Sequence, residues 1–218
     1  MARQHPGEVW SSYMMEGIIR KLVGSKDDED IRWLLENYVI ILYPMINIDG
    51  VIYGNFRCDI TGVDLNRRWK DTPKILYPQI YDIKKKISGY RAKAKVDCVY
   101  DLHGHSKNYN IFAYSCKENP YTCRILPLLI TKRNPVFYFP SCTFGISKYK
   151  ETTARAAIYK IIKNENVLTI ESSFYGSKLN GVVKEFFPKD LFTMGEDILQ
   201  ATRWFLDKKS KVFLAAKN

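Results

Sequence analysis

The three histidines in the sequence lie in two motifs that could bind a metal ion. His5 stands in the segment HPGE, three positions before Glu8 and directly ahead of a predicted helix. A tight turn can bring such a pair onto one ion, and imidazole and carboxylate groups are ordinary zinc ligands. The pattern is short, and it is equally compatible with a surface loop whose histidine and glutamate face solvent.

The second motif, DLHGHS at residues 101–106, follows the predicted strand 96–102. Functional sites in open α/β sheets gather beyond the carboxyl ends of strands. One histidine of this motif, added to the first pair, would leave an open coordination position for water, which is typical of catalytic zinc sites. His103 and His105 face the same way in a strand, so their spacing leaves open which of them is the ligand.

The loop at residues 47–69 gathers side chains that suit anion binding. An arginine next to an asparagine can grip a carboxylate in a bidentate manner. An arginine near a metal can also stabilise a developing oxyanion. A solvated surface loop is the alternative interpretation. The loop places five polar side chains close together in the sequence, namely Arg57, Asp64, Asn66, Arg67 and Arg68.

A further carboxylate, Glu171, ends the predicted strand 167–171. If this strand and the one before His103 end at the same edge of the sheet, Glu171 can act as a general base on a metal-bound water. The alternative is an ordinary glutamate at the end of a strand.

The elements that would position these residues alternate between helices and apolar strands. Because each strand is apolar throughout, the pattern indicates an α/β sandwich with helices on both faces, folded as one domain. Helices are predicted at residues 11–23, 27–36, 74–88, 121–131, 151–163 and 189–208, and strands at 38–43, 96–102, 110–115 and 167–171.

Bulk composition narrows the class of protein. The 218 residues carry 34 Lys and Arg against 23 Asp and Glu, a net charge of +11, and 46% are hydrophobic. That apolar content excludes a disordered chain, and no apolar run is long enough to cross a bilayer or serve as a signal peptide. Five cysteines without CxxC spacing predict neither a disulfide framework nor a thiolate zinc site, and favour a reducing compartment. The charge favours an acidic partner.

Four segments, taken together, resemble the zinc carboxypeptidases of the funnelin type, the M14 class. They are HPGE at 5–8, NIDGVIYGNFRCDITGVDLNRRW at 47–69, DLHGHS at 101–106 and TIESSF at 169–174, and they occur in family order. The versions YGNFRC and DLHGHS resemble the cytosolic carboxypeptidases, which include the tubulin deglutamylases. The resemblance implies a three-layer α/β sandwich whose sheet is mixed and mostly parallel.

The resemblance also implies roles for the metal-binding residues. His5, Glu8 and His103 match the ligands of a single zinc ion, which favours His103 over His105. Asp64 matches the carboxylate that orients the first histidine ligand, a role that fixes the tautomer and direction of the ring.

The substrate-facing residues follow from the same resemblance. Arg57 matches the arginine that polarises the scissile carbonyl, and Asn66 and Arg67 match the pair that grips the terminal carboxylate. Glu171 matches the general base. Tyr149 lies at about the right distance before Glu171 to match the family's mobile tyrosine.

Two departures accompany the resemblance. The family usually has NPDG where this chain has Ile48 in NIDG, which loosens the turn without removing a functional side chain. Only four residues precede His5, so residues 1–218 are expected to be a single catalytic domain that lacks the family's N-terminal strands and the subfamily's N-terminal β domain. An exposed apolar edge is expected there.

The predicted function is hydrolysis of C-terminal amino acids, glutamate above all, from acidic tails such as those of polyglutamylated tubulin. Lys150 and Arg155 are nearby basic candidates for the specificity pocket. The chain is expected to be cytoplasmic, associated with microtubules or cilia, and monomeric, without nucleic-acid or membrane partners. The main alternative is a catalytically inactive, carboxypeptidase-like binding module. A nucleic-acid-binding protein, suggested by charge alone, lacks a recognisable RRM, KH or helix-turn-helix signature.

Overall fold

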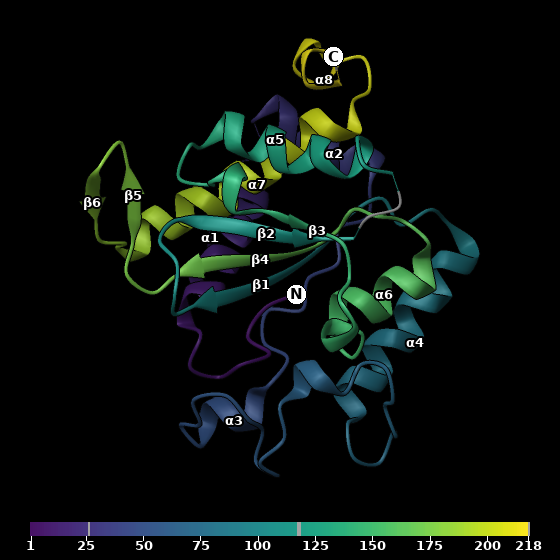
Figure 1. The fold of residues 1–218 in the computed structure, drawn as a ribbon. Helices are drawn as coiled ribbons and strands as arrows, with labels where there is room; N and C mark the ends of the chain where they lie inside the picture. The colour runs from purple at the N-terminus through teal and green to yellow at the C-terminus, as the bar shows by residue number, and fades with distance from the viewer. Residues whose placement is uncertain (26, 117–118, 218) are drawn as a thin grey trace.

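The computed structural model describes residues 1–25, 27–116 and 119–217. Its centre is a four-stranded sheet in the order β1–β4–β2–β3 (Figure 1). The β1–β4 and β2–β3 pairs are parallel, and the β4–β2 pair is antiparallel. A small antiparallel hairpin, β5–β6, lies apart from this sheet. The strands are β1 (Val99–His105), β2 (Ile111–Ser115), β3 (Thr143–Phe144), β4 (Val167–Ser173), β5 (Ser177–Leu179) and β6 (Val182–Lys184).

Helices cover both faces of the sheet (Figure 1). One face packs against α1, α5 and α7, with α2 and α8 outside them, and the other faces α4 and α6. The predicted three-layer α/β sandwich with a mixed sheet is therefore confirmed. The helices are α1 (Val9–Gly24), α2 (Glu29–Asn37), α3 (Ile48–Ile52), α4 (Pro78–Lys93), α5 (Thr122–Arg133), α6 (Ala154–Ile162), α7 (Pro188–Leu206) and α8 (Lys211–Lys217).

Strand alternation separates apolar from polar side chains across the sheet. Leu102 of β1 and Leu168 and Ile170 of β4 belong to the apolar core beneath α1, α5 and α7. Because successive side chains of a strand point to opposite faces, His103 and Glu171 face the other side of the sheet. Asp101, His103 and Glu171 therefore share one face, which is the arrangement that a site requires.

Helix α1 is fixed by direct backbone contact with α7. A Cβ atom at Gly17 would lie 2.1 Å from the main-chain oxygen of Phe192, so only glycine permits this approach. The contact matters for function because α1 begins directly after Glu8. The position of α1 on the sheet thereby sets the position of the first motif.

Residues 38–43 are not a strand, contrary to the prediction. Tyr38 caps the end of helix α2, and an extended segment follows. Among the described residues, one main-chain hydrogen bond joins this segment to a neighbouring segment, from Ala2 N to Tyr43 O. The apolar run packs on one side only, where Ile40 and Leu42 meet the core, while Val39 is 89% exposed. An apolar sequence predicts extended backbone, but a strand also needs a hydrogen-bonded neighbour, which the sequence does not specify.

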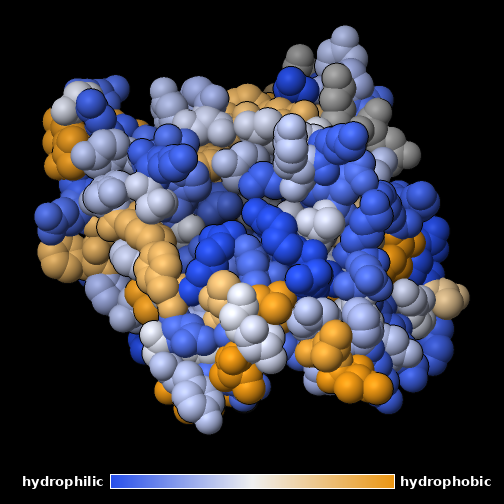
Figure 2. Space-filling view, turned by 60° about the horizontal axis from the view of Figure 1, so that its bottom comes forward, coloured by the Kyte–Doolittle hydropathy of each residue, from blue (hydrophilic) through white to orange (hydrophobic). Residues whose placement is uncertain are grey.

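Apolar side chains also gather on the surface. Figure 2 shows hydrophilic side chains across the middle of the face turned forward, with separate apolar groups along its lower edge. Exposed large apolar residues are concentrated in the segments 48–60 and 75–76. Within the described part of the chain, no helix is both long and apolar enough to span a bilayer.

Candidate metal centre and substrate cleft

The first motif folds into a turn that places two side chains side by side. Glu8 N donates to His5 O across the turn, and Glu8 is the residue that precedes α1, where the helix dipole favours a negative charge. Gly7 passes directly over the loop at Phe56, whose Cδ2 atom would lie 2.5 Å from an added Cβ. A larger residue would separate the first motif from the loop that carries the predicted anion-binding residues.

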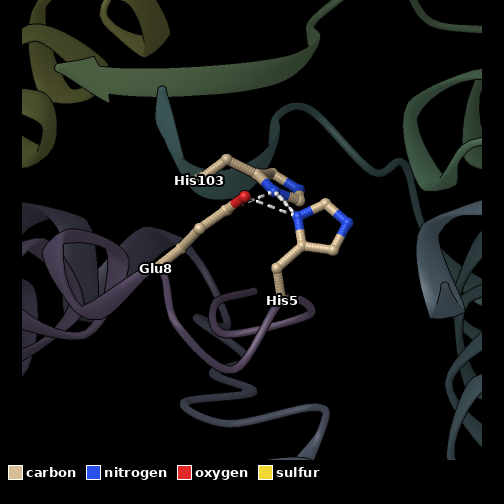
Figure 3. Close-up of side chains that lie close together, drawn as sticks. All are labelled: His5, Glu8 and His103. Atoms are coloured by element: carbon tan, nitrogen blue, oxygen red, sulfur yellow. Dashed lines mark hydrogen bonds and ion pairs between the residues drawn. The ribbon is translucent and has the colours of Figure 1, made fainter. Parts of the chain in front are cut away.

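Three side chains converge from this turn and from β1 (Figure 3). His5 Nδ1 lies 2.7 Å from Glu8 Oε1, and His103 Nδ1 lies 2.9 Å from Glu8 Oε2. The two Nδ1 atoms are 3.2 Å apart. All three residues are buried, with exposures of 5%, 7% and 1% in chain order. They form the single cluster of potential metal ligands within the described residues, and His105 is not a member.

A carboxylate contacts the Nε2 atom of each histidine, on the side of the ring away from the cluster. His5 Nε2 lies 3.0 Å from Asp64 Oδ1, and His103 Nε2 lies 2.9 Å from Asp101 Oδ2. A carboxylate accepts a hydrogen bond, so each Nε2 carries a proton, and a ring in its neutral, metal-binding form turns the lone pair of Nδ1 toward the cluster. Both rings are thereby oriented as metal ligands in the same way.

The electrostatics of the cluster favour charged groups. Burial opposes ionisation of Glu8, but His103 and His5 outweigh it and hold the pKa of Glu8 below its usual range. Burial also disfavours protonated His103, yet Asp101 and Glu8 outweigh it and raise its pKa well above the ordinary value. Without a metal, the three groups therefore hold an extra proton between them, and a cation would replace it.

Glu171 lies directly beside His103 on the neighbouring strand. The β1–β4 register pairs the two residues, so their Cα atoms lie on adjacent parallel strands. Burial raises the pKa of Glu171 to about 7, partly offset by His103. The side chain lines the same cavity as the three clustered residues. A carboxyl group with this pKa can take up and release a proton near neutral pH.

The cleft has a volume of about 220 Å³ and contains most of the predicted site residues. A larger cavity of about 620 Å³ lies at the amino ends of β1 and β4, but none of the motif residues lines it. Residues that line the smaller cavity are His5, Glu8, Phe56, Arg57, Asn66, Arg67, His103, Gly104, His105, Ser106, Tyr114, Lys150, Thr153, Arg155, Thr169, Glu171 and Phe174.

Arg57 reaches the cleft from the loop and is anchored by Asp64. Its Nε and Nη2 atoms donate to Asp64 Oδ2 at 2.9 and 2.6 Å, so Nη1 is left without a partner among the described residues. Burial opposes ionisation of Asp64, but hydrogen bonding to His5 and the charge of Arg57 hold its pKa below the usual range. Asp64 thus connects the predicted oxyanion arginine to the first histidine.

Asn66 and Arg67 lie in a short 3₁₀ helix at the wall of the cleft. Asn66 Oδ1 accepts a hydrogen bond from Ala154 N at 2.8 Å, which ties the loop to α6. Asn66 Nδ2 is 3.4 Å from His103 Nε2, but that nitrogen already donates to Asp101, so the amide hydrogens remain available. Arg67 Nη1 donates to the main-chain oxygen of Asn66 at 3.0 Å.

Two predicted residues lie at the margin of the site. Tyr149 is 90% exposed on the 3₁₀ helix Lys148–Lys150 and does not line the cleft. Arg68 lies over the ring of Tyr77 at 5.8 Å, also outside the cleft. His105 does line it, with its ring edge toward Phe112 and its Nδ1 accepting main-chain hydrogen bonds from the following turn.

Comparison with known proteins assigns the chain to a family. Residues 1–107 match the family model described as "Zinc carboxypeptidase". That range includes the three clustered residues and the loop that carries Arg57 and Asp64. The chain carries a zinc carboxypeptidase domain. The resemblance noted in the sequence is thereby confirmed.

Curated relatives of this zinc carboxypeptidase domain are much longer proteins. Cytosolic carboxypeptidase 3 of Mus musculus is 38% identical over 229 residues, which cover 100% of this chain and 22% of the relative. Cytosolic carboxypeptidase 2 of Xenopus tropicalis is 36% identical and covers 97% of this chain and 22% of its own length. The chain spans about a fifth of the length of these relatives.

Solved structures support the fold of the zinc carboxypeptidase domain. A metallo-carboxypeptidase from Burkholderia cenocepacia has a TM-score of 0.82 at 22% identity and covers 96% of this chain and 56% of its own. A metallo-carboxypeptidase from Pseudomonas aeruginosa, in complex with (2-guanidinoethylmercapto)succinic acid, has a TM-score of 0.81 at 25% identity and covers 95% and 56%.

The clustered residues of the domain fit a zinc ion. Two imidazole nitrogens and one carboxylate are a donor set that catalytic zinc sites use. Three donors at about 2.0–2.1 Å from one tetrahedral ion would lie about 3.3 Å apart. The two Nδ1 atoms are 3.2 Å apart, close to this value, and each lies within 2.9 Å of one of the two Glu8 carboxylate oxygens, so small side-chain shifts would admit the ion.

Three buried residues of the site were missed in the sequence: Asp101, Gln4 and Trp69. Asp101 stands two positions before His103, and i and i+2 residues of a strand share a face. That spacing was available as a signal. Gln4 and Trp69 carried no comparable signal, because their contacts join segments far apart in the sequence.

Proposed function

We propose that the chain is a zinc-dependent carboxypeptidase that removes C-terminal glutamate from acidic protein tails. The observation that carries this proposal is the meeting, in one cleft, of the His5–Glu8–His103 cluster with Glu171 and several cationic side chains. The proposal takes residues 1–218 as one catalytic unit, because β4 packs against both apolar cores of the structure.

The chemistry divides between the metal and the protein. A single zinc ion bound by the cluster would supply Lewis acidity, lowering the pKa of water to about 7 and polarising the scissile carbonyl. Glu171 accepts a proton from the attacking water and returns it to the amine nitrogen that leaves. Arg57 uses its free Nη1 to bind the carbonyl oxygen as negative charge develops there.

Recognition of a free C-terminus falls to the wall of the cleft. Asn66 offers its two amide hydrogens and Arg67 its guanidinium, and both can bind one carboxylate. Tyr149 would have to rotate inward to contact the substrate, and its exposed position leaves that motion free. A substrate without a terminal carboxylate would leave Arg67 unpaired, which makes the enzyme an exopeptidase.

Selection of glutamate is assigned to two further cations. Arg155 is 4% exposed, and its Nη1 donates to the main-chain oxygens of Ser115 and Gly145 at 2.6 and 3.0 Å. No carboxylate forms an ion pair with it among the described residues. Lys150 lies nearby above the ring of Tyr114. A buried cation without a counter-charge is costly, and an acidic side chain would relieve that cost.

Acidic tails also suit the charge of the whole chain. The net charge of +11 creates a positive field that attracts polyanionic segments. Glutamate-rich tails such as those of polyglutamylated tubulin are therefore the proposed substrates. Several relatives are named cytosolic carboxypeptidases, and we propose a cytoplasmic, microtubule-associated location and a monomeric state.

The test is the release of C-terminal glutamate from a peptide ending in several glutamates. The zinc-loaded chain is compared with Glu171→Gln, which preserves shape and removes the proton acceptor. We expect a loss of at least about 100-fold, at the lower end of the effect of general acid–base catalysis. Equal release by both proteins would refute the mechanism. Zinc and peptide binding without release would instead support a binding module.

A further inference from the structure

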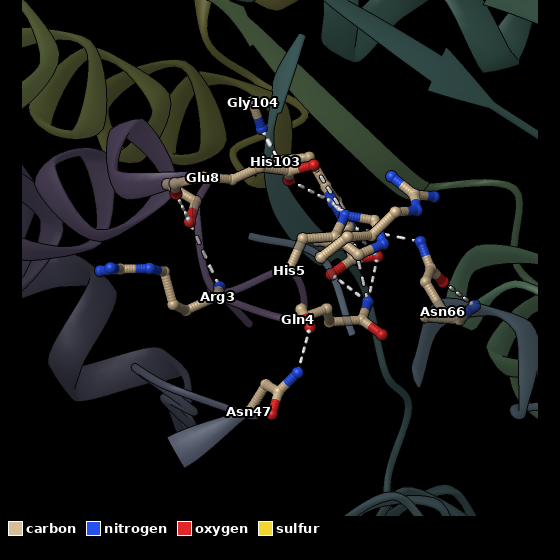
Figure 4. A network of polar contacts seen from close by, with 12 residues as sticks. Arg3, Gln4, His5, Glu8, Asn47, Asn66, His103 and Gly104 are labelled. Atoms are coloured by element: carbon tan, nitrogen blue, oxygen red, sulfur yellow. Dashed lines mark hydrogen bonds and ion pairs between the residues drawn. The ribbon is translucent and has the colours of Figure 1, made fainter. Parts of the chain in front are cut away.

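A chain of buried polar residues stands behind His103 (Figure 4). Gln4 Nε2 donates to both carboxylate oxygens of Asp101 at 2.7 Å, and Gln4 Oε1 accepts from Trp69 Nε1 at 2.7 Å. Asp101 Oδ2 in turn accepts from His103 Nε2 at 2.9 Å. Gln4, Asp101 and Trp69 are 0% exposed, and His103 is 1% exposed.

From this geometry we propose that Gln4 and Asp101 are positioning residues, which hold the imidazole of His103 with Nδ1 toward the metal. The inference rests on the proposed function only in taking His103 as a zinc ligand. It concerns how the protein prepares that ligand, and it assigns neither residue a contact with substrate.

Asp101 fixes the tautomer of His103. A carboxylate only accepts hydrogen bonds, so Nε2 keeps its proton, and the neutral ring that binds a metal presents the lone pair of Nδ1. Among the described residues, no lysine or arginine pairs with Asp101, and its partners are His103 and the Gln4 amide.

Gln4 fixes Asp101, and Trp69 fixes Gln4. If the Gln4 amide were flipped, its oxygen would face the carboxylate of Asp101 and its NH₂ group would face the indole N–H of Trp69. Acceptor would meet acceptor and donor would meet donor, so one orientation alone satisfies both neighbours. The main chain of Gln4 is held as well, because its carbonyl accepts from Asn47 Nδ2 at 3.1 Å.

The chain of contacts also joins the segments that form the site. Gln4 precedes His5, Asp101 and His103 lie on β1, and Trp69 ends the loop that carries Asn66 and Arg67. Loss of Gln4 would therefore loosen both metal-ligand segments relative to each other. Partners that orient metal-bound histidines in this manner typically contribute about 10–100-fold to metal affinity.

The experiment measures zinc dissociation constants by competition with a chelator. The variants are Asp101→Asn, Gln4→Met and Trp69→Phe, each of nearly conserved size. We expect zinc affinity to fall about 10–100-fold for Asp101→Asn, and less for Gln4→Met and Trp69→Phe in that order. Cobalt-substituted protein should show an altered visible spectrum in the first two variants, because the geometry of the ligand changes.

A matched control separates positioning from general stability. Asp197 is also a buried aspartate with two hydrogen bonds, from Arg133 Nε at 2.7 Å and Asn134 Nδ2 at 2.8 Å, but it lies on α7 outside the cleft. Asp197→Asn should lower the melting temperature of the metal-free protein and leave zinc affinity unchanged. Zinc affinities of Asp101→Asn and Gln4→Met no lower than that of this control would overturn the proposal.

One measurement needs no variant and decides the case if Asp101→Asn fails to fold. Nitrogen-15 NMR of the zinc-loaded chain distinguishes a ring bound through Nδ1 from one bound through Nε2. We expect His103 to bind through Nδ1, with a slowly exchanging Nε2 proton. Coordination through Nε2 would overturn the inference. If the chain without substitutions bound no zinc, both the proposed function and this inference would fail. If it bound zinc and the variants bound zinc equally well, only the positioning role would be refuted.

Discussion

The metal cluster and the cationic wall of the cleft are built in opposite ways. His5, Glu8 and His103 are buried, and each has at least two polar partners within the protein. Arg57, by contrast, is half exposed and keeps one guanidinium nitrogen free. The side chains of the metal cluster are already fixed by contacts within the protein, whereas the cationic wall leaves hydrogen-bonding capacity for a ligand.

The difference suits what each region is proposed to bind. A metal ion demands fixed donor atoms, and every freedom left in a ligand reduces affinity. A flexible acidic tail is bound through charge and a few directed hydrogen bonds, whose side chains can adjust at modest cost in entropy. Substitutions in the cluster should therefore alter metal binding, and substitutions in the wall should alter turnover or selectivity with the metal in place.

The largest effect is expected at the metal cluster. His103→Ala removes one of the three proposed ligands, so zinc affinity should fall by more than the roughly 100-fold that outer partners contribute, and turnover should fall with it. His105→Ala is the matched control, because His105 lines the cleft without belonging to the cluster. Elemental analysis and chelator competition provide the measurement. Equal loss of zinc in both variants would refute the claim that His103, and not His105, belongs to the metal cluster.

Arg57 should show the opposite pattern. Arg57→Met removes the proposed donor to the developing oxyanion, so kcat should fall about 10²–10³-fold. Zinc affinity should change little, because Asp64 retains its bonds to His5 and to Asn66 N. Arg68→Met serves as the control, since Arg68 lies outside the cleft. A variant that loses zinc and turnover together would show that the wall and the cluster are not separable.

Lys150 tests selectivity alone. Lys150→Met should reduce the preference for C-terminal glutamate over glutamine about 10-fold or more, the usual value of a hydrogen bond to a charged group. Lys148→Met, on the same short helix but away from the cleft, should leave that preference unchanged. The measurement is the ratio of kcat/KM for two peptides that differ in the last residue. Equal ratios in both variants would refute a role for Lys150.

The smallest effect is a dependence of zinc affinity on pH. The raised pKa of His103 means that the metal-free cluster holds a proton at neutral pH, and zinc must displace it. Affinity should therefore increase with pH, by up to about tenfold per unit for one proton, and level off above the pKa of His103. Calorimetry in two buffers of different ionisation enthalpy counts the protons released. Zinc binding without proton release would contradict the prediction that the metal-free cluster holds a proton.

Much of this architecture was readable from local patterns. The helix predicted at 11–23 forms at 9–24, and the one predicted at 189–208 forms at 188–206, because apolar periodicity reports which face will be buried. The strand predicted at 38–43 was wrong because apolar content indicates burial only. A strand also needs a hydrogen-bonded neighbour, which apolar content does not specify. The hairpin β5–β6, short and partly exposed, carries no such pattern and was missed.

The candidate site divides in the same manner. Residue types and their spacing within motifs predicted His5 with Glu8, the two histidines of DLHGHS, and Glu171, since local geometry alone brings each group to a turn or to the end of a strand. Spacing left His103 and His105 open and the family resemblance favoured His103; the tertiary structure brings His103, and not His105, into the cluster. It also decided that Asp64 connects His5 to Arg57, and that Gln4 stands behind Asp101. Those contacts join residues that lie far apart in the sequence. His5 and Asp64 are 59 residues apart, and Gln4 and Asp101 are 97 residues apart. No local pattern encodes which distant segments will meet.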